Sequence, residues 1–235
     1  MPLVFSFADS LEVYGVDGGG RALRSFVAGF MTGPATTRFT GSQECVQVYL
    51  TPVGVLRLLD VPGAELVNRV TEIADLLPSV SASTTDQLHA ASTWAERFRL
   101  VEDLLLRRVE RGRQADDFVA WMWQRIVAGE GRAPIADLVS ATGWSHRHVT
   151  SRFTHQIGLG PKAAASVVRF ERTAAALSSA PLAEIAHRHG YADQSHLSRE
   201  FVRYTGESPA AHAQASRPTA YTALGQDPGR ISHRQ

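Results

Sequence analysis

The sequence has a single cysteine, Cys45, among 235 residues. One thiol cannot form a disulfide within the chain, and it cannot build a cysteine-based zinc cluster. We expect Cys45 to be a small, largely apolar residue on a strand rather than a nucleophile or a redox sensor.

Long apolar runs are also missing, since none approaches the roughly 20 residues that span a bilayer. The segment from Met1 to Ser10 lacks the basic start and the small-residue cleavage site of a secretory signal. The remaining composition, 44% hydrophobic and 20% charged, is ordinary for a globular protein. These features predict a soluble, cytoplasmic protein with no membrane partner.

An excess of charge of one sign is absent as well, because the formal net charge is only +1. Charge alone therefore identifies no partner. Histidines gather between His146 and His212, where partial protonation would add positive charge. The pairs His146/His148 and His187/His189 are two residues apart, so their rings point to different sides of a helix and we expect no metal site.

The first 50 residues have the short apolar pattern of strands. In Cys45–Leu50, Val46, Val48 and Leu50 alternate with polar or aromatic positions, as in a half-buried strand. Gly18–Gly20 is typical of a turn. Further strands are predicted at 4–7, 11–14 and 26–31.

Helices are predicted from Thr51 onward. Thr51 and Pro52 are a helix cap and a first-turn proline. After a polar loop at 79–86, apolar residues at three- and four-residue spacing predict one long helix ending near Arg111. The arginines at its end are expected to be a solvated helix terminus. A domain boundary is predicted at 111–114.

Beyond that boundary the sequence nearly repeats itself. The first copy contains Pro134-Ile-Ala-Asp-Leu-Val, and the second contains Pro181-Leu-Ala-Glu-Ile-Ala. Gly143 corresponds to Gly190, 47 residues later, and Phe153 corresponds to Phe201, 48 residues later. One residue is therefore inserted at the turn.

Each copy has the pattern of a helix-turn-helix. A proline begins a short apolar helix, glycine ends it, and Ser145 or Asp193 caps a second helix. The aromatic after the glycine, Trp144 or Tyr191, is expected to pack across the turn. The outward and N-terminal residues of the second helices are the predicted contacts to base edges: His146, Arg147, Thr150, Ser151, Arg152, Gln194, Ser195, His196, Ser198 and Arg199.

An alanine-rich helix is predicted between the copies, from Pro161 to about Leu177. Some 17 residues at about 1.5 Å each span roughly 25 Å. Such a connector could place two recognition helices in successive major grooves, about 34 Å apart. A preceding helix, 116–128, is expected to complete the core of the first copy.

This arrangement resembles the AraC family of transcription regulators over 114–213. The resemblance depends on Gly143-Trp-Ser-His-Arg-His-Val, Gly158-Leu-Gly-Pro-Lys, Gly190-Tyr-Ala-Asp-Gln-Ser-His-Leu-Ser-Arg-Glu-Phe and Gly206-Glu-Ser-Pro. Family members commonly have Arg or Lys at the position of Ser151, and Arg147 and Arg152 are expected to compensate. The resemblance implies double-stranded DNA as partner, a sensor-like N-terminal part, no cofactor and no enzymatic activity. RNA polymerase, a small-molecule effector at the N-terminal part and a second copy of the chain are further partners that it leaves open.

The sequence therefore predicts an α+β protein. A small N-terminal α/β sensor-like or oligomerisation domain (1–112) precedes an all-α domain (113–213) with two helix-turn-helix units joined by a linker helix. The tail, 214–235, is expected to be disordered. Two alternatives stay open: a thiol-dependent enzyme or sensor that uses Cys45, and a protein-interaction module that has lost DNA contact.

Overall fold

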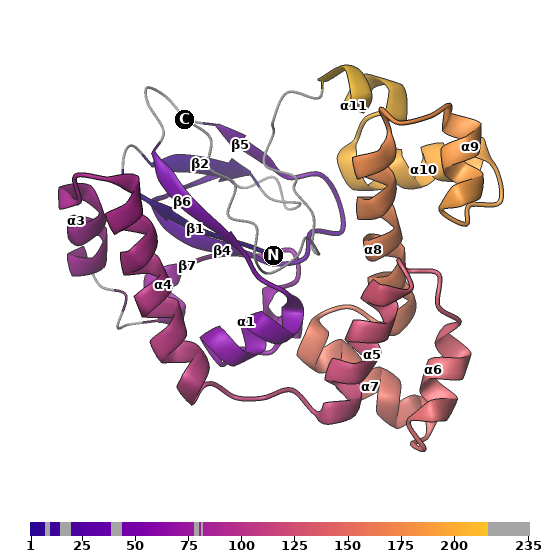
Figure 1. The fold of residues 1–235 in the computed structure, drawn as a ribbon, viewed down its shortest axis with the longest axis horizontal. Coiled ribbons are helices and arrows are strands. Elements are labelled where there is room, and N and C mark those ends of the chain that lie inside the picture. Colours follow the sequence, from indigo (N-terminus) through magenta and orange to yellow (C-terminus); the bar gives the residue numbers. More distant parts are fainter. Residues whose placement is uncertain (8–9, 15–19, 39–43, 78–79, 81, 216–235) are drawn as a thin grey trace.

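The computed structural model describes residues 1–7, 10–14, 20–38, 44–77, 80 and 82–215. The predicted turn at Gly18–Gly20 lies largely outside this part, and so does nearly all of the predicted tail. The described elements form a β-rich N-terminal part followed by a helical C-terminal part, as the sequence predicts (Figure 1).

Two antiparallel sheets form the N-terminal part. The first has the order β6 (Cys45–Tyr49), β1 (Pro2–Ser6), β4 (Ser25–Ala28), β7 (Val70–Glu72), and the second has the order β3 (Gly20–Leu23), β2 (Leu11–Tyr14), β5 (Thr36–Arg38). Strand β1 is central and is buried on both faces. Val4 packs with Phe26 and the second sheet, whereas Leu3 and Phe5 face the helices on the other side. Neighbouring side chains of a strand point in opposite directions, so β1 contributes residues to the hydrophobic clusters on both faces of its sheet.

Helices cover one side of the first sheet. They are α1 (Pro52–Leu59), α2 (Ile73–Leu76), α3 (Ala82–Ala90) and α4 (Trp94–Arg111), with a short 3₁₀ helix, η1 (Gly63–Leu66), after α1. Thr51 caps α1 by accepting a hydrogen bond from the backbone N–H of Gly54 at 3.0 Å, and Pro52 is its first residue, as predicted.

The prediction of one long helix ending near Arg111 is wrong, because the structure has two helices there. Thr93 begins α4 with a capping box: its side chain accepts from the N–H of Glu96, whose carboxylate accepts from the N–H of Thr93. These bonds satisfy the free donors of a helix start, so the chain turns between α3 and α4. The predicted polar loop at 79–86 also contains the beginning of α3.

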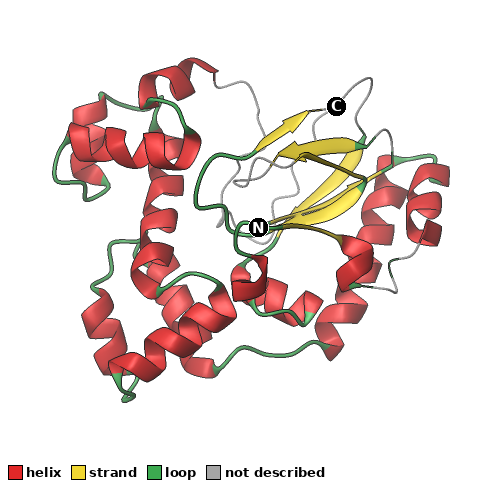
Figure 2. Ribbon diagram, turned by 180° about the vertical axis from the view of Figure 1, so that it is seen from behind, coloured by secondary structure: helices red, strands yellow, loops and turns green. Residues whose placement is uncertain are grey.

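The C-terminal part contains α5 (Asp117–Ala128), α6 (Ile135–Ala141), α7 (His146–Ile157), α8 (Pro161–Ala176), α9 (Leu182–Arg188), α10 (Gln194–Thr205) and α11 (Pro209–Ala215). Helix α8 joins the two helix-turn-helix units (Figure 1). Seen from behind, the strands lie between the α3–α4 pair and these units (Figure 2).

One hydrophobic cluster extends across the predicted boundary. It includes Leu58 of α1 and Leu66 of η1 together with Val149, Phe153 and Ile157 of α7. Helix α7 packs directly against both η1 and α1. The first helix-turn-helix unit is therefore fixed to the N-terminal part, whereas the second unit has a hydrophobic cluster of its own.

Candidate nucleic-acid interface

The first unit consists of α6, a turn and α7. Gly143 lies in the turn after α6 with φ of +73°, a left-handed conformation that glycine adopts without the usual steric cost. Ser145 caps α7, since its Oγ accepts from the N–H of His148 at 3.3 Å. Pro134 is the capping residue before α6 rather than its first residue, a small correction to the predicted helix start.

The second unit repeats this geometry with α9 and α10. Gly190 has φ of +75°, and Asp193 caps α10 by accepting from the N–H of His196 at 2.6 Å. Pro181 again precedes its helix as the cap. The two units are therefore alike in backbone as well as in sequence.

The second helices bury an apolar stripe and expose a polar one. Val149 and Phe153 of α7, and Leu197 and Phe201 of α10, are fully buried. Eight of the ten predicted contact residues lie on the exposed or half-exposed part of the helices without another role that the structure defines: His146, Arg147, Thr150, Ser151, Gln194, Ser195, Ser198 and Arg199.

Arg147 and Arg199 are the two cations that this surface offers. Both side chains are exposed, and within the described residues neither has an ion-pair or hydrogen-bond partner. They occupy different places in their helices, because the residue that corresponds to Arg147 is Ser195 and the one that corresponds to Arg199 is Ser151. Each recognition helix thus presents one available guanidinium, at a different position along the helix.

Arg152 is held within the protein. Its Nε and Nη2 donate to the two carboxylate oxygens of Asp116 at 2.8 and 2.9 Å. Hydrogen bonding by Arg152 lowers the pKa of Asp116 below its ordinary value. The Oε1 of Gln156 also accepts from the N–H of Asp116 at 2.9 Å. This pair fixes α7 to the start of α5, so Arg152 positions the recognition helix with donors that sequence reasoning had assigned to DNA.

His196 is also engaged within its unit. Its Nδ1 lies 3.4 Å from the N–H of Ala192, and its Nε2 lies 3.9 Å from the carboxylate of Glu200. Its ring is nearly perpendicular to the ring of Tyr191, with centroids 5.3 Å apart. His196 therefore contacts the turn before α10 and also lies near the predicted DNA-binding face of this helix.

A hollow of about 660 Å³ lies beside the exposed face of α7. Four predicted residues line it, namely His146, Arg147, Thr150 and Ser151, and Thr154 and His155 continue the lining. Ala64 of η1 forms its edge. Sequence reasoning missed Ala64 because this residue is some 80 positions away and only the folding of η1 against α7 brings it there.

The aromatic residues after the turn glycines differ between the units. Tyr191 is buried, as expected, with 5% of its surface exposed. Trp144 is 57% exposed and stacks on His148 with ring centroids 4.8 Å apart, so the prediction that it packs across the turn is wrong. Its exposed face stands next to the N-terminus of α7.

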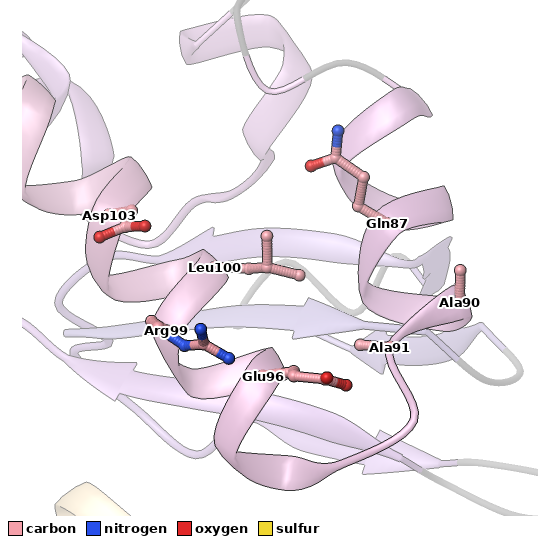
Figure 3. Close-up of a pocket in the computed structure, with 7 residues that line it drawn as sticks. All are labelled: Gln87, Ala90, Ala91, Glu96, Arg99, Leu100 and Asp103. Carbon is pink, nitrogen blue, oxygen red and sulfur yellow. The ribbon is translucent and has the colours of Figure 1, made fainter.

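A second hollow, of about 380 Å³, lies between α3 and α4 (Figure 3). Gln87 of α3 and Arg99, Leu100 and Asp103 of α4 line it. These helices are on the opposite side of the N-terminal part from α9 and α10 (Figure 1). This hollow is therefore separate from the nucleic-acid interface.

Cys45 lies half-buried on β6, and burial raises the pKa of its thiol. A raised pKa disfavours the thiolate, which is the reactive form. In the part of the chain that the structure describes, no group of three or more His, Cys, Asp or Glu side chains is arranged to hold a metal ion. None of the described helices is both long and apolar enough to cross a bilayer.

Two helix-turn-helix units with capped second helices and polar outer faces define a DNA-binding protein. Residues 138–215 match the helix-turn-helix domain family. The chain is 30% identical over 240 residues to a protein of Streptomyces antibioticus named as an AraC-like transcription regulator, an alignment that covers 92% of this chain and 77% of that one. This chain belongs to the AraC family of transcription regulators.

Two solved structures of ToxT agree with the fold. ToxT from Vibrio cholerae O395 covers 93% of this chain and 90% of its own, with a TM-score of 0.53 and 10% identity. A ToxT structure described as bound to an unsaturated fatty acid has a TM-score of 0.52 and 11% identity. The C-terminal domain of AraT, a response regulator from Geobacillus stearothermophilus, covers 48% of this chain at 21% identity with a TM-score of 0.41.

Proposed function

We propose that this regulator reads a specific DNA sequence by inserting α7 and α10 into successive major grooves on one face of the duplex. The observation that carries the proposal is the pair of available arginines, Arg147 and Arg199, on the exposed faces of two similarly capped helices. An arginine that donates two hydrogen bonds to a guanine edge is the commonest specific contact in the major groove.

The connector has a suitable length for this arrangement. Helix α8 has 16 residues, which at about 1.5 Å each span roughly 24 Å. With the width of the units added at both ends, this length suits groove centres about 34 Å apart. One chain can then occupy both grooves.

The different places of the two arginines favour an asymmetric site. Arg147 is the second residue of α7, whereas Arg199 is the sixth residue of α10. The two helices therefore meet different base steps, and the two half-sites differ in sequence. The remaining contacts come from His146, Thr150, Ser151, Gln194, Ser195 and Ser198, while Arg152 and His196 act through the local packing described above.

Residues 1–112 and 113–213 are the two functional divisions in this proposal, with the break at the link between α4 and α5. The N-terminal part then has a regulatory role, and the chain acts in the cytoplasm without enzymatic activity. The raised pKa of Cys45 supports this over the thiol-dependent alternative. Beside DNA, the proposed partners are a small-molecule effector at the N-terminal part, in line with the fatty acid bound in a ToxT structure, RNA polymerase and a second copy of the chain.

Selection from random duplexes followed by binding measurements tests the proposal. Arg147→Ala and Arg199→Ala are each expected to weaken discrimination at one half-site by about 1 to 3 kcal/mol if the lost contact is a two-bonded guanine pair. Arg125→Ala is the matched control, because it removes a cation on α5 that lies over Trp121. Sequence-specific binding that survives the double substitution would show that these residues do not read the site.

A further inference from the structure

The placement of α10 relative to α7 depends on few connections. The first unit shares the cluster of the N-terminal part, whereas the second unit packs around Phe170, Ile185, Leu197 and Phe201. Helix α8 passes from one cluster to the other. Any additional contact between the units then decides how rigidly the two recognition helices are spaced.

The turn between α5 and α6, residues 129–133, makes such a contact with α8. Gly131 has φ of +74°, and a Cβ at this position would lie 2.1 Å from the carbonyl oxygen of Ala165 and 2.7 Å from the backbone nitrogen of Arg169. Both distances are below 3.0 Å, which real Cβ contacts essentially never show. The turn therefore lies backbone against backbone on the middle of α8.

The same turn reaches the end of α9 in the second unit. Nη1 of Arg132 donates to the carbonyl oxygen of Arg188 at 3.4 Å, which satisfies one of the free acceptors at a helix C-terminus. The stem of Arg132 also lies along Gly190, where a Cβ would be 3.4 Å from its Cδ. A cation at this end of a helix is favourable as well.

His189 is buried beside this contact, and neither ring nitrogen has a hydrogen-bond partner among the described residues. Burial lowers the pKa of its imidazole, the charges of Arg188, Arg132 and Arg172 lower it further, and Glu130 opposes them. The neutral form of this buried ring is therefore favoured.

Helix α10 is in turn fixed to α8. The carboxylate of Glu200, 8% exposed, pairs with Nη2 of Arg169 at 3.1 Å and accepts from the hydroxyl of Ser166 at 2.9 Å. The recognition helix α10 is thus fixed to α8, and both α8 and α9 contact the turn 129–133.

We infer that the turn 129–133, through Arg132, is a brace that sets the spacing of the two recognition helices and hence the half-site spacing that the protein accepts. This inference rests on the two-groove function proposed above. Arg132 is a positioning residue, since it acts through the carbonyl end of α9 rather than on DNA.

Binding to duplexes with altered spacing tests the brace. One inserted base pair moves the second half-site by about 3.4 Å and rotates it by roughly 35°. We expect the wild-type protein to lose about tenfold or more in affinity on this insertion, in line with a misplaced set of base contacts. In Arg132→Ala the loss is expected to shrink to about threefold or less, with weaker binding at the natural spacing, because the second unit can then adjust.

Arg188→Ala is the matched control. It also removes a cation from this region, but its side chain pairs with Glu184 and its carbonyl remains as acceptor. It is expected to keep the wild-type spacing preference. Arg132→Met, which keeps the stem and loses the donors, separates packing from hydrogen bonding and is expected to behave like Arg132→Ala.

The outcomes distinguish the two proposals. An unchanged spacing preference in both Arg132 variants overturns the brace while leaving the two-groove function intact. A wild-type protein that binds single half-sites as tightly as paired ones overturns the two-groove function, and the brace with it.

Discussion

Replacement of Gly63 by alanine is the sharpest test of how the N-terminal part is attached to the first helix-turn-helix unit. Gly63 begins η1 and lies against the end of α7. A Cβ at this position would be 2.3 Å from the carbonyl oxygen of Ile157 and 2.8 Å from the backbone nitrogen of Gly158. Because these neighbours are backbone atoms, no side-chain rotation can relieve the clash.

The expected cost follows from this geometry. Since Cβ contacts below 3.0 Å essentially do not occur, η1 and α7 must move apart by roughly 1 Å. Overpacking of this kind costs about 1 to 3 kcal/mol. For a protein of this size each kcal/mol lowers the melting temperature by about 2 to 4 °C, so Gly63→Ala is expected to melt roughly 2 to 12 °C below the wild type.

Thermal unfolding followed by circular dichroism measures this effect. Gly160→Ala is the control, because its Cβ would lie 3.6 Å from Oγ1 of Thr154, an ordinary contact, and its φ is −62°. Its cost as a change of helix cap is expected to stay below about 1 kcal/mol. Equal melting temperatures for the two variants would refute the close backbone packing of η1 on α7.

Three further predictions concern buried and paired charges. Glu200→Gln is expected to lower the free energy of unfolding, measured by urea denaturation, by about 3 kcal/mol, because it leaves Arg169 without its carboxylate partner. A loss below about 1 kcal/mol would contradict the pairing. Burial lowers the pKa of His189 in the folded protein, so the unfolded chain binds this proton first and stability falls as pH drops below the ordinary value of 6.5. His189→Gln should flatten this decline in stability. An identical pH profile would argue against a neutral ring in the folded protein. Asp116 also has a lowered pKa, so its pair with Arg152 stabilises the fold above pH 3.8, and this stabilisation is lost as pH falls through the pKa of Asp116 in the folded protein. Asp116→Asn should remove this acid-dependent contribution when unfolding is measured as a function of pH. An unchanged profile would count against the pair.

Much of the helical part could be predicted from the sequence because its signals are local. Glycines with positive φ, capping side chains and apolar spacing recur in both copies. The helices α6 to α10 lie where these signals predict them. The linker helix was likewise expected from Pro161, which begins α8. Such features depend on residues within a few positions of one another.

The structure differs from the sequence predictions where residues far apart in the chain determine a side chain's contacts. Arg152 has the position of a DNA contact in the sequence, but Asp116, 36 residues earlier, takes its donors. Trp144 has the same local pattern as Tyr191, yet only the second unit provides a buried site with Glu200 for the aromatic hydroxyl. Periodicity also could not show the break between α3 and α4, because the apolar spacing continues through a turn that Thr93 creates.

The cluster shared by α1, η1 and α7 has a practical consequence for dissecting this regulator. A fragment that starts at residue 113 would uncover the side of α7 that Leu58 and Leu66 now shield, while Arg147 and Ser151 would be unchanged. Such a truncated protein would present fresh apolar surface to water and is expected to self-associate. Excision of α9 to α11 instead would leave this shared cluster whole and would uncover the side of α8 that carries Phe170.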